Sequence, residues 1–172
     1  ADLERITTKA VGASRTRRQQ SLIDVVRAAI HDPDRGKVLV FTQHTEVAED
    51  LLRQLATEGI DAVAYHGGIA AAGRRKAIEE FRRSVPVMVA TDAGAEGLNL
   101  QFCNCVVNYD LPWNPMKIEQ RIGRVHRVGQ HRDVHVVNIY AVETVEDRVY
   151  ELLRDKLKMF ELLFGQITMI LG

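Results

Sequence analysis

The sequence predicts an α/β fold in which helices cover both faces of a mostly parallel β-sheet. Short apolar runs rich in β-branched residues alternate with amphipathic stretches of helical length, and this alternation is typical of β-α-β units. Right-handed crossovers between parallel strands then place helices on both sides of the sheet. The chain has 172 residues, of which 46% are hydrophobic and 27% are charged. These values are ordinary for one globular domain with a well-buried core.

The composition also excludes several classes of protein. No apolar run approaches the ~18 residues of a membrane-spanning helix, and the opening segment, ADLERITTKA, lacks the apolar centre of a signal peptide. Cys103 and Cys105 are badly spaced for a disulfide or a metal site. We therefore expect reduced thiols in a cytoplasmic protein and no metal ligands. The 23 basic and 23 acidic residues cancel, so the net charge does not predict a polyanionic partner.

The predicted elements follow in order along the chain. Residues 1–20 are polar and basic and are expected to form a linker. Apolar positions at three- and four-residue spacing predict the helices, compact β-branched runs predict the strands, and Gly or Pro residues separate them. The predicted helices cover 22–30, 45–58, 69–81, 114–128 and 144–164, and the predicted strands cover 37–42, 60–65, 85–90, 105–109 and 134–141.

Polar and glycine-rich loops follow the carboxyl ends of these strands, where open α/β sheets bind their ligands. In the loop 91–99, Gly94 and Gly97 permit a close backbone approach or a positive φ. Thr91, Asp92 and Asn99 supply short polar side chains for contacts to sugar or phosphate. The alternative is a plain strand-to-helix connection in which the glycines serve the turn and Thr91 or Asp92 caps a helix.

A cluster of arginines gives the strongest local signal. Between positions 117 and 132 the sequence holds five cations and one carboxylate, a local charge of +4. Arg121, Arg124 and Arg127 lie three residues apart, so in a helix they form one stripe that suits the binding of phosphate oxygens. Gly123 leaves room for a close approach. The alternative is a solvated basic helix face. The cations are Lys117, Arg121, Arg124, Arg127 and Arg132.

Two motifs of a complete nucleotide site are absent from this sequence. It contains no G-x-x-x-x-G-K-S/T phosphate-binding loop, because Gly36-Lys37 precedes a strand and is followed by Val38. It also contains no D-E-x-D/H box at a strand end to hold Mg²⁺. The chain supplies arginines for a nucleotide without the phosphate cradle, which corresponds to half of an active site.

The sequence resembles the second RecA-like lobe of superfamily-two helicases and translocases. The resemblance is to the Swi/Snf-type ATPases and their bacterial RNA-polymerase-associated relatives. Gln120 stands where DEAD-box helicases usually carry His, and Gly123 stands where many chromatin remodellers carry an acidic residue. The first difference favours the Swi/Snf branch over the DEAD-box helicases, and the second favours a bacterial or archaeal relative over a chromatin remodeller. The motifs that carry the resemblance are KVLVFTQ (37–43), YHGG (65–68), ATDAGAEGLNL (90–100), NYDLPWNP (108–115) and QRIGRVHRVGQ (120–130).

The resemblance implies a three-layer α/β/α sandwich and a role for each matched position. Arg124 and Arg127 are similar to the paired arginines that reach ATP held, with Mg²⁺, by the N-terminal lobe. The residues implied at the ATP or inter-lobe side are Gln120, Gly97, Asn99, Glu96 and Arg121. The residues implied along the nucleic-acid backbone are Gln43, His44, His66, Gly67, Thr91 and Asp92. Backbone contacts carry no sequence information, so the expected parent activity is sequence-independent movement on duplex DNA.

The resemblance also sets the expected domain boundaries and partners. Residues 1–20 are expected to be a linker or inter-lobe segment, 21–165 the RecA-like lobe, and 166–172 an apolar tail. The expected partners are the N-terminal lobe of the same chain and duplex DNA, with RNA or RNA polymerase as further possibilities. No membrane partner is expected, and the location is bacterial or archaeal cytoplasm near the nucleoid. The isolated lobe is expected to be inactive and monomeric, or weakly dimeric through the tail.

Two alternatives from other functional classes remain open. The chain could be a non-catalytic nucleic-acid-binding module that keeps the RecA-like scaffold. This alternative draws on the basic segment at 1–20 and on the arginine stripe. A protein-interaction domain that docks through the helix at 144–164 is the other, although the apolar face of that helix is what any packed helix has.

Overall fold

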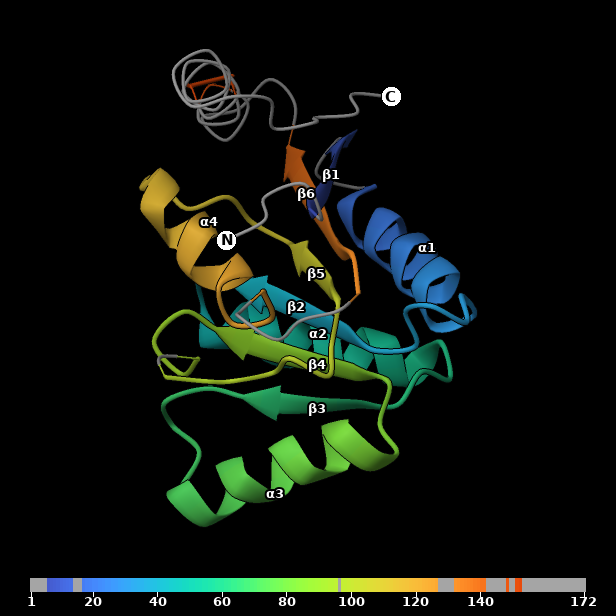
Figure 1. Ribbon diagram of the computed structural model, residues 1–172, viewed down its shortest axis with the longest axis vertical. Helices are drawn as coiled ribbons and strands as arrows, with labels where there is room; N and C mark the ends of the chain where they lie inside the picture. The colour runs from blue at the N-terminus through green and yellow to red at the C-terminus, as the bar shows by residue number, and fades with distance from the viewer. Residues whose placement is uncertain are drawn as a thin grey trace.

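The computed structural model describes residues 6–13, 17–95, 97–126, 132–141, 148 and 151–152. Six strands and four helices make up the described part of the chain (Figure 1). The strands are β1 (Ile6–Ala13), β2 (Val38–Thr42), β3 (Ala62–Tyr65), β4 (Val87–Thr91), β5 (Cys105–Asn108) and β6 (Val134–Ala141). The helices are α1 (Arg18–Ile30), α2 (Thr45–Thr57), α3 (Ala71–Arg83) and α4 (Pro115–Ile122).

The strands form one sheet in the order β1-β6-β5-β2-β4-β3. Every neighbouring pair is parallel. The register pairs Val40 with Val89 on one side of β2 and with Val107 on the other. Parallel strands of this kind are connected by crossovers, so all their carboxyl ends lie at one edge of the sheet. The five strands predicted from the sequence are present, and so is the predicted parallel arrangement.

Two apolar clusters on opposite faces of the sheet make the core. Alternate residues of β2 separate between them, with Val38 and Val40 on the face of α1 and α2. Leu39 and Phe41 lie on the face of α3. All five residues of β2 are buried, as expected for a central parallel strand with both faces covered. The layers are therefore helix, sheet and helix, as the sequence predicts (Figure 1).

Strand β1 is an element that the sequence analysis missed. The segment expected to be a basic linker, 1–20, contains Ile6–Ala13, which pairs with β6 along all eight residues. Helix α1 begins at Arg18, also inside the expected linker. The apolar pattern did not reveal β1 because an edge strand is not enclosed by strands on both sides and tolerates polar residues such as those of Thr7-Thr8-Lys9.

Helix α4 is shorter than the predicted helix 114–128. Asn114 caps its start, because the side-chain oxygen accepts a hydrogen bond of 3.1 Å from the Met116 N–H, and Pro115 occupies the first turn. The helix ends at Ile122 with Gly123 as its C-cap. The next residues turn so that Val125 is fully buried. The prediction failed because apolar spacing continued past the glycine that ends the helix.

Some predicted features lie outside the described residues. They include the helix at 144–164, of which only isolated positions are described, and the tail 166–172. Among the helices described, none combines the length and the apolar character needed to cross a bilayer.

Candidate functional site

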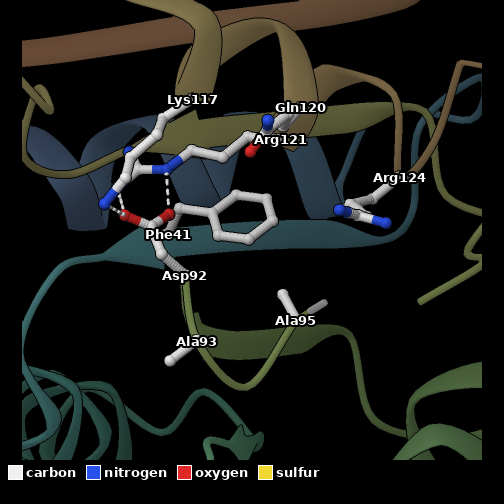
Figure 2. Close-up of a pocket in the computed structure, with 8 residues that line it drawn as sticks. All are labelled: Phe41, Asp92, Ala93, Ala95, Lys117, Gln120, Arg121 and Arg124. Atoms are coloured by element: carbon white, nitrogen blue, oxygen red, sulfur yellow. Dashed lines mark hydrogen bonds and ion pairs between the residues drawn. The ribbon is translucent and has the colours of Figure 1, made fainter. Parts of the chain in front are cut away.

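A hollow of about 400 Å³ lies at the carboxyl edge of the sheet, beside α4. Phe41, near the end of β2, lies at its base, and the loop after β4 borders it (Figure 2). It lies among the carboxyl ends of central strands, where ligands bind in open α/β sheets. The residues that line it are Phe41, Asp92, Ala93, Ala95, Lys117, Gln120, Arg121 and Arg124.

The turn that carries Arg124 is fixed by its neighbours. Val125 is buried in the apolar cluster between the sheet and α3, together with Leu98 and Leu100. The Leu100 N–H donates a hydrogen bond of 2.8 Å to the Arg124 carbonyl. This bond ties the end of the loop 91–99 to the turn after α4. The structure therefore brings Leu100, next to Asn99, beside Arg124.

Arg121 has a different environment, because its guanidinium is 2% exposed and fully engaged. Its Nε–H and one Nη2–H donate to the two carboxylate oxygens of Asp92, at 2.6 and 3.0 Å. The Nη1 donors reach the Asn108 Oδ1 at 3.1 Å and the Asp110 carbonyl at 2.9 Å. The second Nη2–H points to the Asp110 carboxylate at 3.5 Å. All five donors of the guanidinium thus have protein acceptors.

Asp110 extends this polar cluster to β2. Its Oδ2 accepts a hydrogen bond of 2.5 Å from the Thr42 hydroxyl and one of 3.0 Å from the Gln43 N–H. Asn108 extends the cluster to β6, because its Nδ2 donates to the Asn138 Oδ1 at 2.6 Å. We call these residues the Arg121 network. Its members are Thr42, Asp92, Asn108, Asp110, Arg121 and Asn138, together with the backbone N–H of Gln43.

Arg124, in contrast, keeps its guanidinium uncommitted. No hydrogen bond or ion pair with another described residue engages it, and Figure 2 shows it apart from the Arg121–Asp92 pair, on the far side of the Phe41 ring. Lys117 is half exposed and approaches Asp92 only to 3.9 Å, a distance that contributes little in solvent. Gln120 is exposed between them. The hollow therefore offers cationic groups to a ligand with negative charge.

The predicted loop glycines have the two roles that the sequence suggested. Gly97 has a φ of 78°, in the left-handed region that favours glycine. Gly94 permits a close approach, since a Cβ there would lie 2.5 Å from the His66 Cα and 2.9 Å from the Tyr65 carbonyl oxygen. The approach is to another loop of the same chain. It brings the backbone at Tyr65 and His66 against the loop that begins at Thr91.

The predicted backbone-binding residues divide into two groups. Gln43 and His66 are partly exposed, and His44 and Gly67 are exposed, so these four can be reached from solvent. Thr91 is 4% exposed and its hydroxyl accepts a hydrogen bond of 3.3 Å from the Gly94 N–H. Asp92 is paired with Arg121. Thr91 and Asp92 therefore make contacts within the protein. The described residues between β4 and β5 contain no helix, so neither of them caps one, as the alternative had expected.

The predicted arginine stripe differs from the structure at two of its positions, Arg121 and Arg124. Arg121 and Arg124 do not lie on one helical stripe, because α4 ends at Ile122. Arg121, predicted to contact ATP or the other lobe, has every donor taken by the protein. Arg127 and Glu96, two further predicted site residues, lie outside the described residues.

Sequence reasoning missed Asn108, Asp110 and Asn138 as members of the site. A signal for them exists, since each Asn follows or interrupts a run of apolar strand residues, in CVVN and VHVVNIYA. A buried polar side chain is usually hydrogen-bonded, and such an Asn therefore indicates a partner nearby.

Comparison with known proteins identifies the family of this chain. The model of the helicase conserved C-terminal domain matches residues 19–129. The uncharacterized ATP-dependent helicase YqhH of Bacillus subtilis is 45% identical over 135 residues, which cover 78% of this chain and 24% of that protein. The RNA polymerase-associated protein RapA of Vibrio cholerae is 40% identical over 112 residues, which cover 63% of this chain and 12% of RapA. The chain thus spans a small part of the length of these relatives.

Two solved structures have the same fold. The C-terminal part of the Fun30 ATPase domain superposes with a TM-score of 0.72 at 27% identity, over 79% of this chain and 45% of that one. The DEAD-box protein SrmB of E. coli superposes with a TM-score of 0.74 at 21% identity, over 100% of this chain and 91% of that one. The second likeness concerns the fold alone, and both confirm the RecA-like architecture. With the motif blocks in order and the family model matched over 19–129, the chain belongs to the helicase conserved C-terminal domain family, and its relatives are of the Swi/Snf type in superfamily two.

Proposed function

We propose that this chain is the second motor lobe of an ATP-dependent DNA translocase or helicase. In this role it supplies Arg124 and Arg127 to ATP bound on an N-terminal lobe and grips the nucleic-acid backbone with its strand-end loops. The relative YqhH is named an ATP-dependent helicase, and this name favours ATP as the nucleotide. The cytoplasm of a bacterial or archaeal cell is the location that we propose.

The observation that carries the proposal is the uncommitted guanidinium of Arg124 beside the hollow. Desolvating an arginine at a cleft without a partner is unfavourable unless a ligand supplies negative charge. A planar guanidinium can donate two parallel hydrogen bonds to phosphate oxygens. At the γ-phosphate of ATP it would stabilise the charge that develops during phosphoryl transfer.

The residues of the hollow fit the phosphate groups of ATP better than they fit Mg²⁺. Lys117, Gln120 and Arg124 offer donors to phosphate oxygens. The nearby carboxylates of Asp92 and Asp110 already accept hydrogen bonds from Arg121, and Asp110 also from Thr42 and Gln43. We therefore propose that Mg²⁺, which neutralises phosphate charge when bound, is held by the other lobe.

The same edge of the sheet offers a surface for nucleic acid. The accessible residues Gln43, His44, His66 and Gly67 follow β2 and β3, and backbone N–H groups and short polar side chains at such loops suit phosphate contacts. We propose that they contact the backbone of duplex DNA. Contacts of this kind predict binding that is independent of sequence and weakens steeply with salt.

The test of this proposal compares the chain alone with the chain joined to an N-terminal lobe that carries the two missing motifs. We expect no steady ATP hydrolysis by the chain alone and DNA-stimulated hydrolysis by the two-lobed protein. In the two-lobed protein, Arg124→Ala should lower the DNA-stimulated kcat by roughly 10³-fold, the scale of arginine-finger losses, with ATP binding largely kept. Steady-state phosphate release and binding of a fluorescent ATP analogue measure the two quantities.

A matched control is Arg53→Ala on α2, which removes an exposed arginine paired with Asp50. It should leave kcat unchanged. Robust ATP turnover by the chain alone would contradict the proposal. A normal DNA-stimulated kcat in the Arg124→Ala variant would contradict it as well. Salt-dependent DNA binding without hydrolysis in the two-lobed protein would instead favour the non-catalytic module.

A further inference from the structure

The buried guanidinium of Arg121 joins segments that are far apart in the sequence. Its acceptors lie after β4, on β5 and after β5, at Asp92, Asn108 and Asp110. Its Cζ also lies 5.3 Å from the centre of the Phe41 ring, on β2. Since it is 2% exposed and all five donors are used, it has no donor left for a phosphate group.

One side of this network leads to the hollow. Arg121 lies in the last turn of α4, and its backbone carbonyl accepts a hydrogen bond of 3.1 Å from the Arg124 N–H. The position of Arg124 therefore depends on where α4 ends, and the pairing of Arg121 holds that end of α4 against the sheet.

The other side leads to the loops with accessible polar residues. Through Asp110 the network holds the Gln43 N–H, at 3.0 Å from the carboxylate oxygen. Through Asp92 it holds the loop whose Gly94 lies directly against the backbone of His66. A shift of Asp92 or Asp110 would move these loops, because the contacts are short and the surroundings are closely packed.

We propose that Arg121 is a positioning residue that couples nucleic-acid binding at the strand-end loops to ATP hydrolysis at the hollow. The inference rests on the proposed function and deepens it by naming the side chain that links the two surfaces. Arg121 touches neither ligand and acts through the placement of Arg124 and of the loops at Gln43 and His66. If DNA binding moved the loops, the hydrogen bonds of the Arg121 guanidinium would transmit that movement to α4 and so shift Arg124.

The geometry demands arginine at this position. A lysine keeps the positive charge but offers three donors from a single nitrogen, whereas the acceptors here surround a planar group with five. Arg121→Lys would pair with one carboxylate and leave other acceptors of the network unsatisfied. This conservative variant therefore removes the linkage between segments while it keeps a cation near Asp92.

The experiment measures the two-lobed protein with and without duplex DNA. For Arg121→Lys we expect the ratio of DNA-stimulated to basal kcat to fall at least tenfold, while the KM for ATP changes less than twofold. If Arg121 had only a structural role, its substitution would lower the melting temperature. The protein that remained folded would then keep the wild-type ratio of DNA-stimulated to basal kcat. Asp92→Asn, which keeps the shape of the acceptor and removes its charge, should lower the same ratio and serves if Arg121→Lys does not fold.

Arg27→Lys is the matched control, because Arg27 forms an exposed ion pair with Glu58, away from the network. It should leave the ratio unchanged. A normal ratio in both Arg121→Lys and Asp92→Asn overturns the inference, and so does a KM for ATP that rises with the fall in kcat, which would indicate direct nucleotide contact. If DNA does not stimulate hydrolysis by the wild-type two-lobed protein, both the proposed function and this inference are contradicted. If DNA stimulates hydrolysis equally in the wild type and in both variants, the inference is wrong and the proposed function stands.

Discussion

Gly94 is the residue at which two loops of the site depend on a single missing atom. The nearest atoms to a Cβ at this position are backbone atoms of Tyr65 and His66, which cannot rotate away as the end of a flexible side chain can. Any larger residue must therefore push the loop after β4 away from the segment at His66. Because Thr91 and Asp92 begin that loop, the displacement would reach the Arg121 network.

Gly94→Ala is expected to lower the free energy of unfolding by about 1–3 kcal/mol, the usual cost of overpacking. Gly67→Ala is the control, because a Cβ at Gly67 meets nothing within 4 Å, and it should change stability by no more than about 1 kcal/mol. Urea unfolding followed by circular dichroism measures both. Equal midpoints for the two variants would contradict the packing at Gly94.

The arginines show what sequence can and cannot predict at the scale of a residue. Their spacing predicted one helical stripe, whereas α4 ends at Ile122 and Arg124 lies in the turn that follows. The spacing could not separate Arg121 from Arg124, because a helical pattern does not reveal whether a side chain will meet internal carboxylates. That outcome depends on Asp110 and Asn108, which lie on another element and enter only through the fold.

At the scale of elements, the central strands with both faces covered were predictable, and so was the edge strand β3, but the edge strand β1 was not. β2 and β4 are apolar at every position except the final threonine and are buried throughout, so composition alone identifies them. β1 lies at the edge of the sheet, where its stability comes from backbone pairing with β6. Backbone pairing leaves no apolar signature in the sequence, and α4 was overextended for a similar reason, since its end depends on a glycine within a continuing apolar pattern.

Removal of residues 1–13 is therefore expected to speed amide hydrogen exchange in β6 by at least about tenfold, because β6 becomes an unpaired edge and opens locally. β4 should keep its protection, since β5 and β2 stand between it and β6. Hydrogen–deuterium exchange with mass spectrometry of peptides from both strands makes the comparison. Unchanged exchange in β6 would show that β1 contributes little to the sheet.

At the scale of the whole molecule, each of the two apolar clusters buries one thiol, Cys105 on the face of α1 and α2 and Cys103 on the face of α3. Cys103 and Cys105 are each 0% exposed. Burial raises the pKa of Cys103 to about 12 and that of Cys105 to about 11. They therefore stay protonated and unreactive in the folded chain, because the thiolate is the nucleophilic form.

The raised pKa values predict that stability falls at alkaline pH. The stabilising contribution is complete below pH 9, the ordinary pKa of these thiols. Above it the unfolded chain loses its thiol protons while the folded chain keeps them, so stability declines by about 1.4 kcal/mol per pH unit and thiol until the folded pKa is reached. Unfolding by urea between pH 8 and 11 measures the slope, and a double variant, Cys103→Ala with Cys105→Ala, should lose this part of it. An equal slope in the double variant would contradict the burial of the thiols.

The pairing of β1 with β6 has a consequence for the order in which the sheet is built. The ribosome releases residues 6–13 before residues 134–141 have been synthesised, so β1 has no partner in the sheet until β6 has emerged. Contacts between such distant segments carry a large loop-closure entropy and form late in folding. During that interval the unpaired backbone of the nascent strand is available to other chains. Completion of the sheet is therefore coupled to the synthesis of β6.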